Sequence, residues 1–110
     1  MRESAVETYL KKTAISNGYL CYKFTSPGED GVPDRVLIGH GLTFFVETKA
    51  PGKDLRKLQK YVRKQILNHG GIDLIIDTKE KVNQLFEMLS QNKNQKEVIE
   101  CIIQSFGEKE

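Results

Sequence analysis

One short segment of the chain carries two side chains that could act together on a phosphate ester. Phe45-Val46-Glu47-Thr48-Lys49 places a carboxylate and an ammonium two residues apart at the end of an apolar run. On a β-strand, side chains two residues apart point to the same side of the sheet. Both charges are costly to remove from water unless they have partners or a function. A Glu-x-Lys pair alone is more often a surface ion pair, so the prediction needs support from elsewhere.

A second carboxylate supplies part of that support. Gly31-Val32-Pro33-Asp34 stands at the entrance of the preceding apolar segment, although Pro-Asp by itself simply favours a turn. The tight connection Gly39-His40-Gly41 predicts that the two apolar segments pair as a hairpin, which would bring Asp34 near Glu47. Two carboxylates beside Lys49 would suit a hard cation such as Mg²⁺. In metal-assisted hydrolysis the lysine could orient the attacking water or stabilise developing charge.

Two other residues interrupt the apolar faces of predicted helices. Glu3 falls inside the apolar arc of the first helix, with Glu7 at the edge of that arc. An acid there could instead stabilise the helix N-terminus, and we leave both interpretations open, as well as the choice between Glu3 and Glu7. Gln59 falls between Leu55 and Val62 on the apolar face of the second helix. A buried amide needs hydrogen-bond partners, which either the site or an ordinary core could supply.

The elements that must position these residues follow the order α-β-β-β-α-β-α-α. Apolar residues recur at helical spacing in the second helix, at Leu55, Leu58, Val62 and Ile66. We expect an α/β fold with a mixed sheet flanked by helices. The predicted helices are Arg2–Asn17, Asp54–His69, Lys79–Gln91 and Gln95–Ser105, and the predicted strands are Tyr19–Thr25, Arg35–Ile38, Leu42–Thr48 and Ile72–Ile76.

The length of 110 residues favours a single domain, 1–110. The net charge of +2 is too balanced to indicate nucleic acid by itself. The stretch 49–64, however, contains several basic residues and one acid, Asp54, which is either a phosphate-binding patch or a solvated helix face. These basic residues are Lys49, Lys53, Arg56, Lys57, Lys60, Arg63 and Lys64.

The remaining residues with reactive side chains suggest no other chemistry. Cys21 and Cys101 are far apart and predict a reduced, cytoplasmic protein rather than a disulfide-linked one. His40, in the predicted turn, and His69, at a helix end, have no second ligand at metal-binding spacing, and we interpret both as structural. No apolar run approaches the length of a membrane span, so we expect no membrane association.

Taken in order, these motifs resemble those of a known family. Glu3 in a first helix, Gly31-Val32-Pro33-Asp34, Glu47-Thr48-Lys49-Ala50-Pro51-Gly52, Leu58-Gln59-Lys60 and Gly70-Gly71 are similar to the virus-type replication-repair nuclease domain. This domain is a branch of the PD-(D/E)xK superfamily. The resemblance covers a core of about 3–77 and leaves about 78–110 as a C-terminal helical extension. We expect this extension to be either a dimerisation element or an extra packing layer.

The resemblance implies a function and a role for each matched residue. It implies hydrolysis of DNA phosphodiester bonds with Mg²⁺ or Mn²⁺. Asp34, Glu47 and the Thr48 carbonyl would be metal ligands, Lys49 would orient water, Glu3 would be the first-helix acid, and Gln59 would support the site. Small stand-alone members imply a homodimer that resolves four-way (Holliday) junctions in branched DNA. DNA contacts are predicted at Lys53, Arg56, Lys57, Lys60 and Lys64.

Two alternative functions remain open. The chain could cleave flaps or another branched or duplex DNA as a monomer. It could also be a non-catalytic DNA-binding module that retains the fold, although such a module would not need Asp34, Glu47 and Lys49 together.

Overall fold

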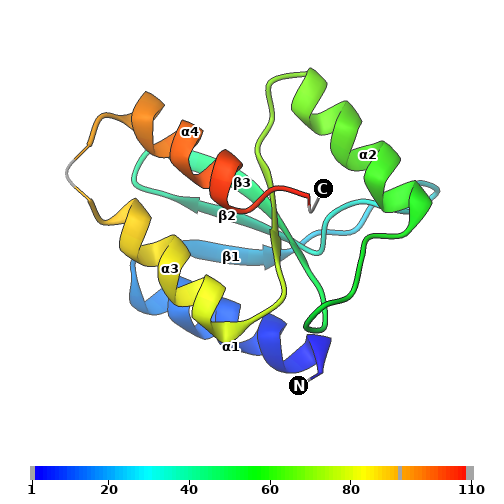
Figure 1. Cartoon of the computed structure of the whole chain (residues 1–110), viewed down its shortest axis with the longest axis horizontal. Helices are drawn as coiled ribbons and strands as arrows, with labels where there is room; N and C mark the ends of the chain where they lie inside the picture. Colours follow the sequence, from blue (N-terminus) through cyan, green and yellow to red (C-terminus); the bar gives the residue numbers. More distant parts are fainter. Residues whose placement is uncertain (1, 92, 109–110) are drawn as a thin grey trace.

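The computed structural model describes residues 2–91 and 93–108. Its elements follow the predicted order, α-β-β-β-α-β-α-α (Figure 1). The helices are α1 (Glu3–Ser16), α2 (Lys57–Asn68), α3 (Lys79–Leu89) and α4 (Gln95–Ser105), and the strands are β1 (Leu20–Lys23), β2 (Arg35–Gly39), β3 (Leu42–Thr48) and β4 (Asp73–Ile76).

The four strands form one mixed sheet in the order β1-β2-β3-β4. The pairs β1–β2 and β2–β3 are antiparallel, whereas β3 and β4 run parallel and are connected through α2. The predicted hairpin joins β2 to β3. Its two turn residues, His40 and Gly41, both have left-handed backbone angles, with φ of 53° and 80°. A tight turn of this kind matches the twist of the paired strands and fixes their register.

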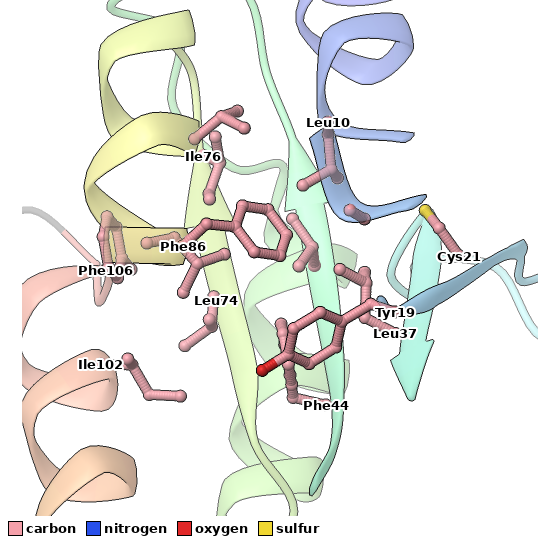
Figure 2. Close-up of a cluster of buried hydrophobic side chains, with 14 of the residues drawn as sticks. Leu10, Tyr19, Cys21, Leu37, Phe44, Leu74, Ile76, Phe86, Ile102 and Phe106 are labelled. Atoms are coloured by element: carbon pink, nitrogen blue, oxygen red, sulfur yellow. The ribbon is translucent and has the colours of Figure 1, made fainter. Parts of the chain in front are cut away.

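The hydrophobic core lies on one face of the sheet. Phe44 and Val46 of β3 point to this face, together with Leu74 and Ile76 of β4, and all four side chains are fully buried. Helices α1, α3 and α4 cover them, with Leu10, Phe86 and Ile102 among the packed side chains (Figure 2). α1 and α3 lie side by side over this layer (Figure 1). Because strand side chains alternate, Glu47 and Lys49 must point to the opposite face.

Helix α2 packs on that opposite face and differs from the prediction. It begins at Lys57, not Asp54, because the Gln59 side chain accepts a hydrogen bond from the Arg56 backbone N–H (2.9 Å) and fixes the first turn. The predicted apolar stripe is also wrong at Leu58, which is 47% exposed. The buried residues of α2 are Gln59 and Arg63, since the sheet beneath them presents acidic side chains.

Helices α1 and α3 and strands β1 and β4 are shorter than predicted, β2 is one residue longer, and β3 and α4 have the predicted bounds. β1 is confined to Leu20–Lys23, β4 begins at Asp73, and α3 ends at Leu89. The segment after α4 closes the outer edge of the sheet: the Ile75 N–H donates a hydrogen bond to the Phe106 carbonyl (2.8 Å). Among the described residues, both cysteines are free thiols, and no helix has the length and apolar character needed to cross a membrane.

Candidate active site

Asp34 lies where β2 begins, beside the end of β3. The next residue, Arg35, pairs with Val46 across the antiparallel strands β2 and β3. In this register Asp34 lies beside Glu47 and Thr48, at the end of β3. The Oδ2 atom of Asp34 accepts hydrogen bonds from the Thr48 backbone N–H and the Thr48 hydroxyl, both at 2.8 Å. These contacts fix the orientation of the carboxyl group at the C-terminal end of β3.

Glu47 is held from the other side by α2. Its side chain is only 3% exposed, and its Oε1 accepts a 2.7 Å hydrogen bond from Nε2 of Gln59. Gln59 is itself fixed, because its Oε1 accepts from the Arg56 N–H. The sequence predicted a buried amide with partners at this position, and the structure confirms both the burial and the partners.

The electrostatic environment of Glu47 shows which charges lie near it. Burial, together with the negative charges of Asp34 and Asp73, raises the pKa of Glu47 to about 8. The Lys49 ammonium acts in the opposite direction and lowers this pKa, while Glu3 raises it slightly. The fold therefore brings Asp34, Glu47 and Lys49 together, with a local excess of negative charge.

Glu3 does not lie on a buried helix face as predicted. It is exposed, because it is the first residue of α1 and the core-facing residues of the helix begin only at Val6. Its negative charge nevertheless makes a small contribution to the raised pKa of Glu47. Glu7, the alternative acid of this helix, is engaged elsewhere, in an ion pair with Nε of Arg35 at 3.4 Å.

A further buried carboxyl group, Asp73, was not predicted as part of the site. Asp73 is 1% exposed on β4 and faces α2, and burial raises its pKa to about 7 despite the opposing effect of the Arg63 charge. The Arg63 guanidinium donates to the Asp73 backbone carbonyl (3.0 Å). Within the described residues, Oδ1 of Asp73 has no hydrogen-bond partner. The sequence did contain a signal for this residue, because Asp73 is a carboxylate within the otherwise apolar segment Ile72–Ile76.

The loop that follows Lys49 is fastened by a second unpredicted acid. Asp77, directly after β4, accepts a hydrogen bond from the Gly52 N–H (3.2 Å) and forms an ion pair with Lys81 (2.8 Å). Gly52 has a left-handed φ of 77°, which suits glycine. Asp77 thus connects the 50–53 loop to α3 and limits the movement of the chain beyond Lys49.

The donor set of this site fits a divalent cation. Asp34 and Glu47 each use one carboxylate oxygen for protein hydrogen bonds, at Oδ2 and Oε1, and the other oxygen of each has no such bond within the described residues. Clustered carboxylates with free oxygen atoms are the expected environment for a bound divalent cation. No group of three or more His, Cys, Asp or Glu side chains arranged for metal binding occurs in the part of the chain described. The two carboxylates are therefore the candidate side-chain ligands, with the Thr48 carbonyl as a further candidate.

The basic residues separate into two groups. The five predicted to contact DNA are all exposed on α2 and the segment before it: Lys53, Arg56, Lys57, Lys60 and Lys64. Arg63, which belongs to the same basic stretch of the sequence, is buried instead. It turns inward toward Asp73 and Glu108, so it is not part of the exposed basic surface.

Comparison with known proteins places this fold among the nuclease folds of the PD-(D/E)xK superfamily. No protein-family model matches the sequence. A solved structure of a VRR_NUC domain superposes with a TM-score of 0.72 at 25% identity, covering 77% of this chain and 94% of that one. A protein of Acyrthosiphon pisum secondary endosymbiont phage 1, named "Putative nuclease p44", is 40% identical over 72 residues, which are 63% of this chain and 77% of the phage protein. The chain belongs to the virus-type replication-repair nuclease (VRR-NUC) family.

Proposed function

We propose that this protein is a nuclease that requires Mg²⁺ or Mn²⁺ and cleaves branched DNA, resolving four-way junctions as a homodimer. The nuclease assignment is supported by membership of the VRR-NUC family and by the similarity to the phage protein. The observation that carries the proposal is the convergence of Asp34, Glu47 and Lys49 at the end of β3, with Glu47 held by Gln59.

Each residue of the site has a distinct role in the proposed reaction. Asp34 and Glu47 would hold the cation, which would polarise the phosphate and favour ionisation of a bound water. Lys49 would orient the attacking water and stabilise the negative charge that develops on the phosphate. Gln59 acts through Glu47 as a positioning residue. We retain Glu3 as the first-helix acid, because it contributes to the electrostatic environment of Glu47 although it is exposed.

The DNA would lie along the exposed basic surface, contacting Lys53, Arg56, Lys57, Lys60 and Lys64. Contacts of this kind recognise the phosphate backbone irrespective of sequence and weaken with salt. A homodimer is expected because each chain carries one candidate site, whereas symmetrical resolution of a junction needs two cuts.

The test is a cleavage panel combined with a measurement of mass in solution. Purified protein is incubated with a four-way junction, a flap and a linear duplex in Mg²⁺, in Mn²⁺ and in EDTA. The proposal expects metal-dependent cleavage of the junction by a species of twice the chain mass. Selective cleavage of flaps by a monomer would replace the junction assignment, and DNA binding without cleavage of any substrate would leave only a binding module.

A further inference from the structure

The outward face of α2 carries two large apolar side chains that the core does not use. Leu58 and Tyr61 are 47% and 61% exposed. They are three residues apart and therefore neighbours on the helix surface. Tyr61 points away from the sheet, since Gln59 and Arg63 form the buried side of the same helix. These two side chains form an exposed apolar pair, which we call the α2 apolar pair.

The charges around this pair indicate what it could contact. Lys57 and Lys64 lie four residues before and three residues after Tyr61, and Lys60 precedes it directly. All three lysines are exposed, and α2 contains no acidic residue. The α2 apolar pair is surrounded by positive charges only. Such a surface is poorly suited to an ordinary protein interface, because lysine is depleted at the centre of those interfaces. It is well suited to a polyanion that also offers flat apolar surfaces.

The α2 apolar pair lies on the helix that holds Glu47 of the candidate active site. Gln59, which holds Glu47, lies between Leu58 and Tyr61 in sequence and on the opposite side of the same turn. Leu58 also contacts the loop that leads to Asp34. A Cβ atom on Gly31 would lie 2.8 Å from the Leu58 carbonyl oxygen and 2.9 Å from its Cγ, so the loop approaches Leu58 as closely as glycine allows.

A hollow lies beside Leu58 at this point. It has a volume of about 310 Å³ and is lined by Asp30, Gly31, Arg56 and Leu58. Leu58 provides an apolar wall, and the Arg56 guanidinium can stack on a flat ring or contact a phosphate. Pockets of this order of size accommodate small ring systems.

We propose that the α2 apolar pair and the adjoining hollow form a subsite for unstacked nucleobases on the side of α2 that faces away from Glu47. Tyr61 stacks on one base while the lysines around it hold the backbone, which is how proteins commonly bind strands whose bases are unpaired. Leu58 lines the place of a second displaced base. This inference rests on the proposed function and makes it more specific: the preferred DNA has bases that unstack easily, as at a branch point.

The test uses binding under conditions that do not require cleavage. A four-way junction with 2-aminopurine beside a crossover base is titrated with wild-type protein in Ca²⁺, and 2-aminopurine emission increases when that neighbouring base leaves the stack. Tyr61→Ala should weaken junction binding roughly ten-fold, in line with the loss of one aromatic–base stack, and should abolish the increase in emission. Tyr61→Phe, which keeps the ring, should behave as the wild type. Leu58→Ala should lower the emission change at a second labelled position.

Controls separate this subsite from general damage and from the proposed nuclease activity. Gln65→Ala changes the exposed residue one turn beyond Tyr61 and should leave both junction affinity and emission unchanged. Because Tyr61 is mostly exposed, its truncation should leave the melting temperature unchanged. Equal junction affinity for Tyr61→Ala and Gln65→Ala, or no emission change with the wild type, overturns the subsite. Binding with base unstacking but without cleavage in Mg²⁺ overturns the nuclease assignment and leaves the subsite intact.

Discussion

Nε2 of Gln59 donates a 2.7 Å hydrogen bond to Oε1 of Glu47, and Oε1 of the same amide accepts from the N–H of Arg56. One side chain therefore determines where α2 begins and how the buried carboxyl group of β3 is oriented. The helix and the candidate site are mechanically connected through this amide.

This connection predicts the effect of removing the amide. Gln59→Ala should lower kcat for DNA cleavage by roughly ten- to a hundred-fold, because small displacements of a site group are costly in rate. KM for DNA should change little, since the Gln59 side chain is buried and is not available for contact with DNA. Steady-state cleavage of a four-way junction measures both constants. Gln65→Ala, on the exposed side of α2, is the matched control, and a change confined to KM would contradict the positioning role.

Lys49→Ala should abolish metal-dependent cleavage while DNA binding persists. Lys49 lies close enough to Glu47 to lower the pKa of its carboxyl group, and it lies outside the exposed surface of α2. Cleavage and gel-shift assays on the same junction separate the two effects. Full activity in Lys49→Ala would eliminate the proposed mechanism.

The raised pKa values of Glu47 and Asp73 predict that the metal-free protein is more stable in mild acid than in mild base. Their values rise from ordinary levels of 4.5 and 3.8 to about 8 and about 7 in the folded chain. The folded state therefore holds more protons than the unfolded state between about pH 4 and pH 8, and the free energy of unfolding falls as the pH rises through this window.

Thermal melts in EDTA at pH 5 and pH 8 measure this dependence. The melting temperature should be several degrees lower at pH 8, given that about 1 kcal/mol corresponds to roughly 4–8 °C for a domain of this size. Glu47→Gln should reduce the difference, whereas Glu100→Gln, at an exposed position of α4, should not. Added Mn²⁺ should raise the melting temperature of the wild type at pH 8. A higher melting temperature at pH 8 than at pH 5 in EDTA would contradict the prediction.

The exposed basic surface predicts how DNA affinity depends on salt concentration. Lys60 is exposed on α2, and if it contacts a phosphate, Lys60→Ala should weaken junction binding and reduce the slope of log affinity against log salt by about one. Lys96→Ala, at an exposed position of α4, should leave the slope unchanged. The same slope for wild type and Lys60→Ala would remove Lys60 from the interface.

The local sequence was sufficient to predict the order of elements and the pairing of Asp34 with the end of β3. Strand alternation and the Gly39-His40-Gly41 connection are short-range signals, and the fold obeys both. The burial of Gln59 was also predicted, because helical spacing from Leu55 and Val62 puts its amide on the side of the helix that faces the protein.

The errors came from the tertiary environment. Helical periodicity predicted Leu58 on the buried, apolar face of α2. The sheet beneath that helix, however, presents the acidic side chains of Glu47 and Asp73. The fold therefore turns Gln59 and Arg63 inward and leaves Leu58 exposed. Glu3 was misplaced for a related reason: a helical wheel gives direction but does not say where the packed layer begins. Asp73 was overlooked because its apolar neighbours suggested a fully hydrophobic strand.

The contact between Ile75 and Phe106 has a consequence for how the molecule behaves at high concentration. Strands at the edge of a sheet offer unpaired backbone groups onto which another chain can add. The segment after α4 occupies part of that position along β4, through the Phe106 carbonyl, and the opposite edge is the short strand β1, which ends in Lys23. Short strands and lysine both discourage strand addition. We therefore expect the folded protein to resist fibrillar aggregation through its sheet, and removal of residues 106–108 to weaken that protection.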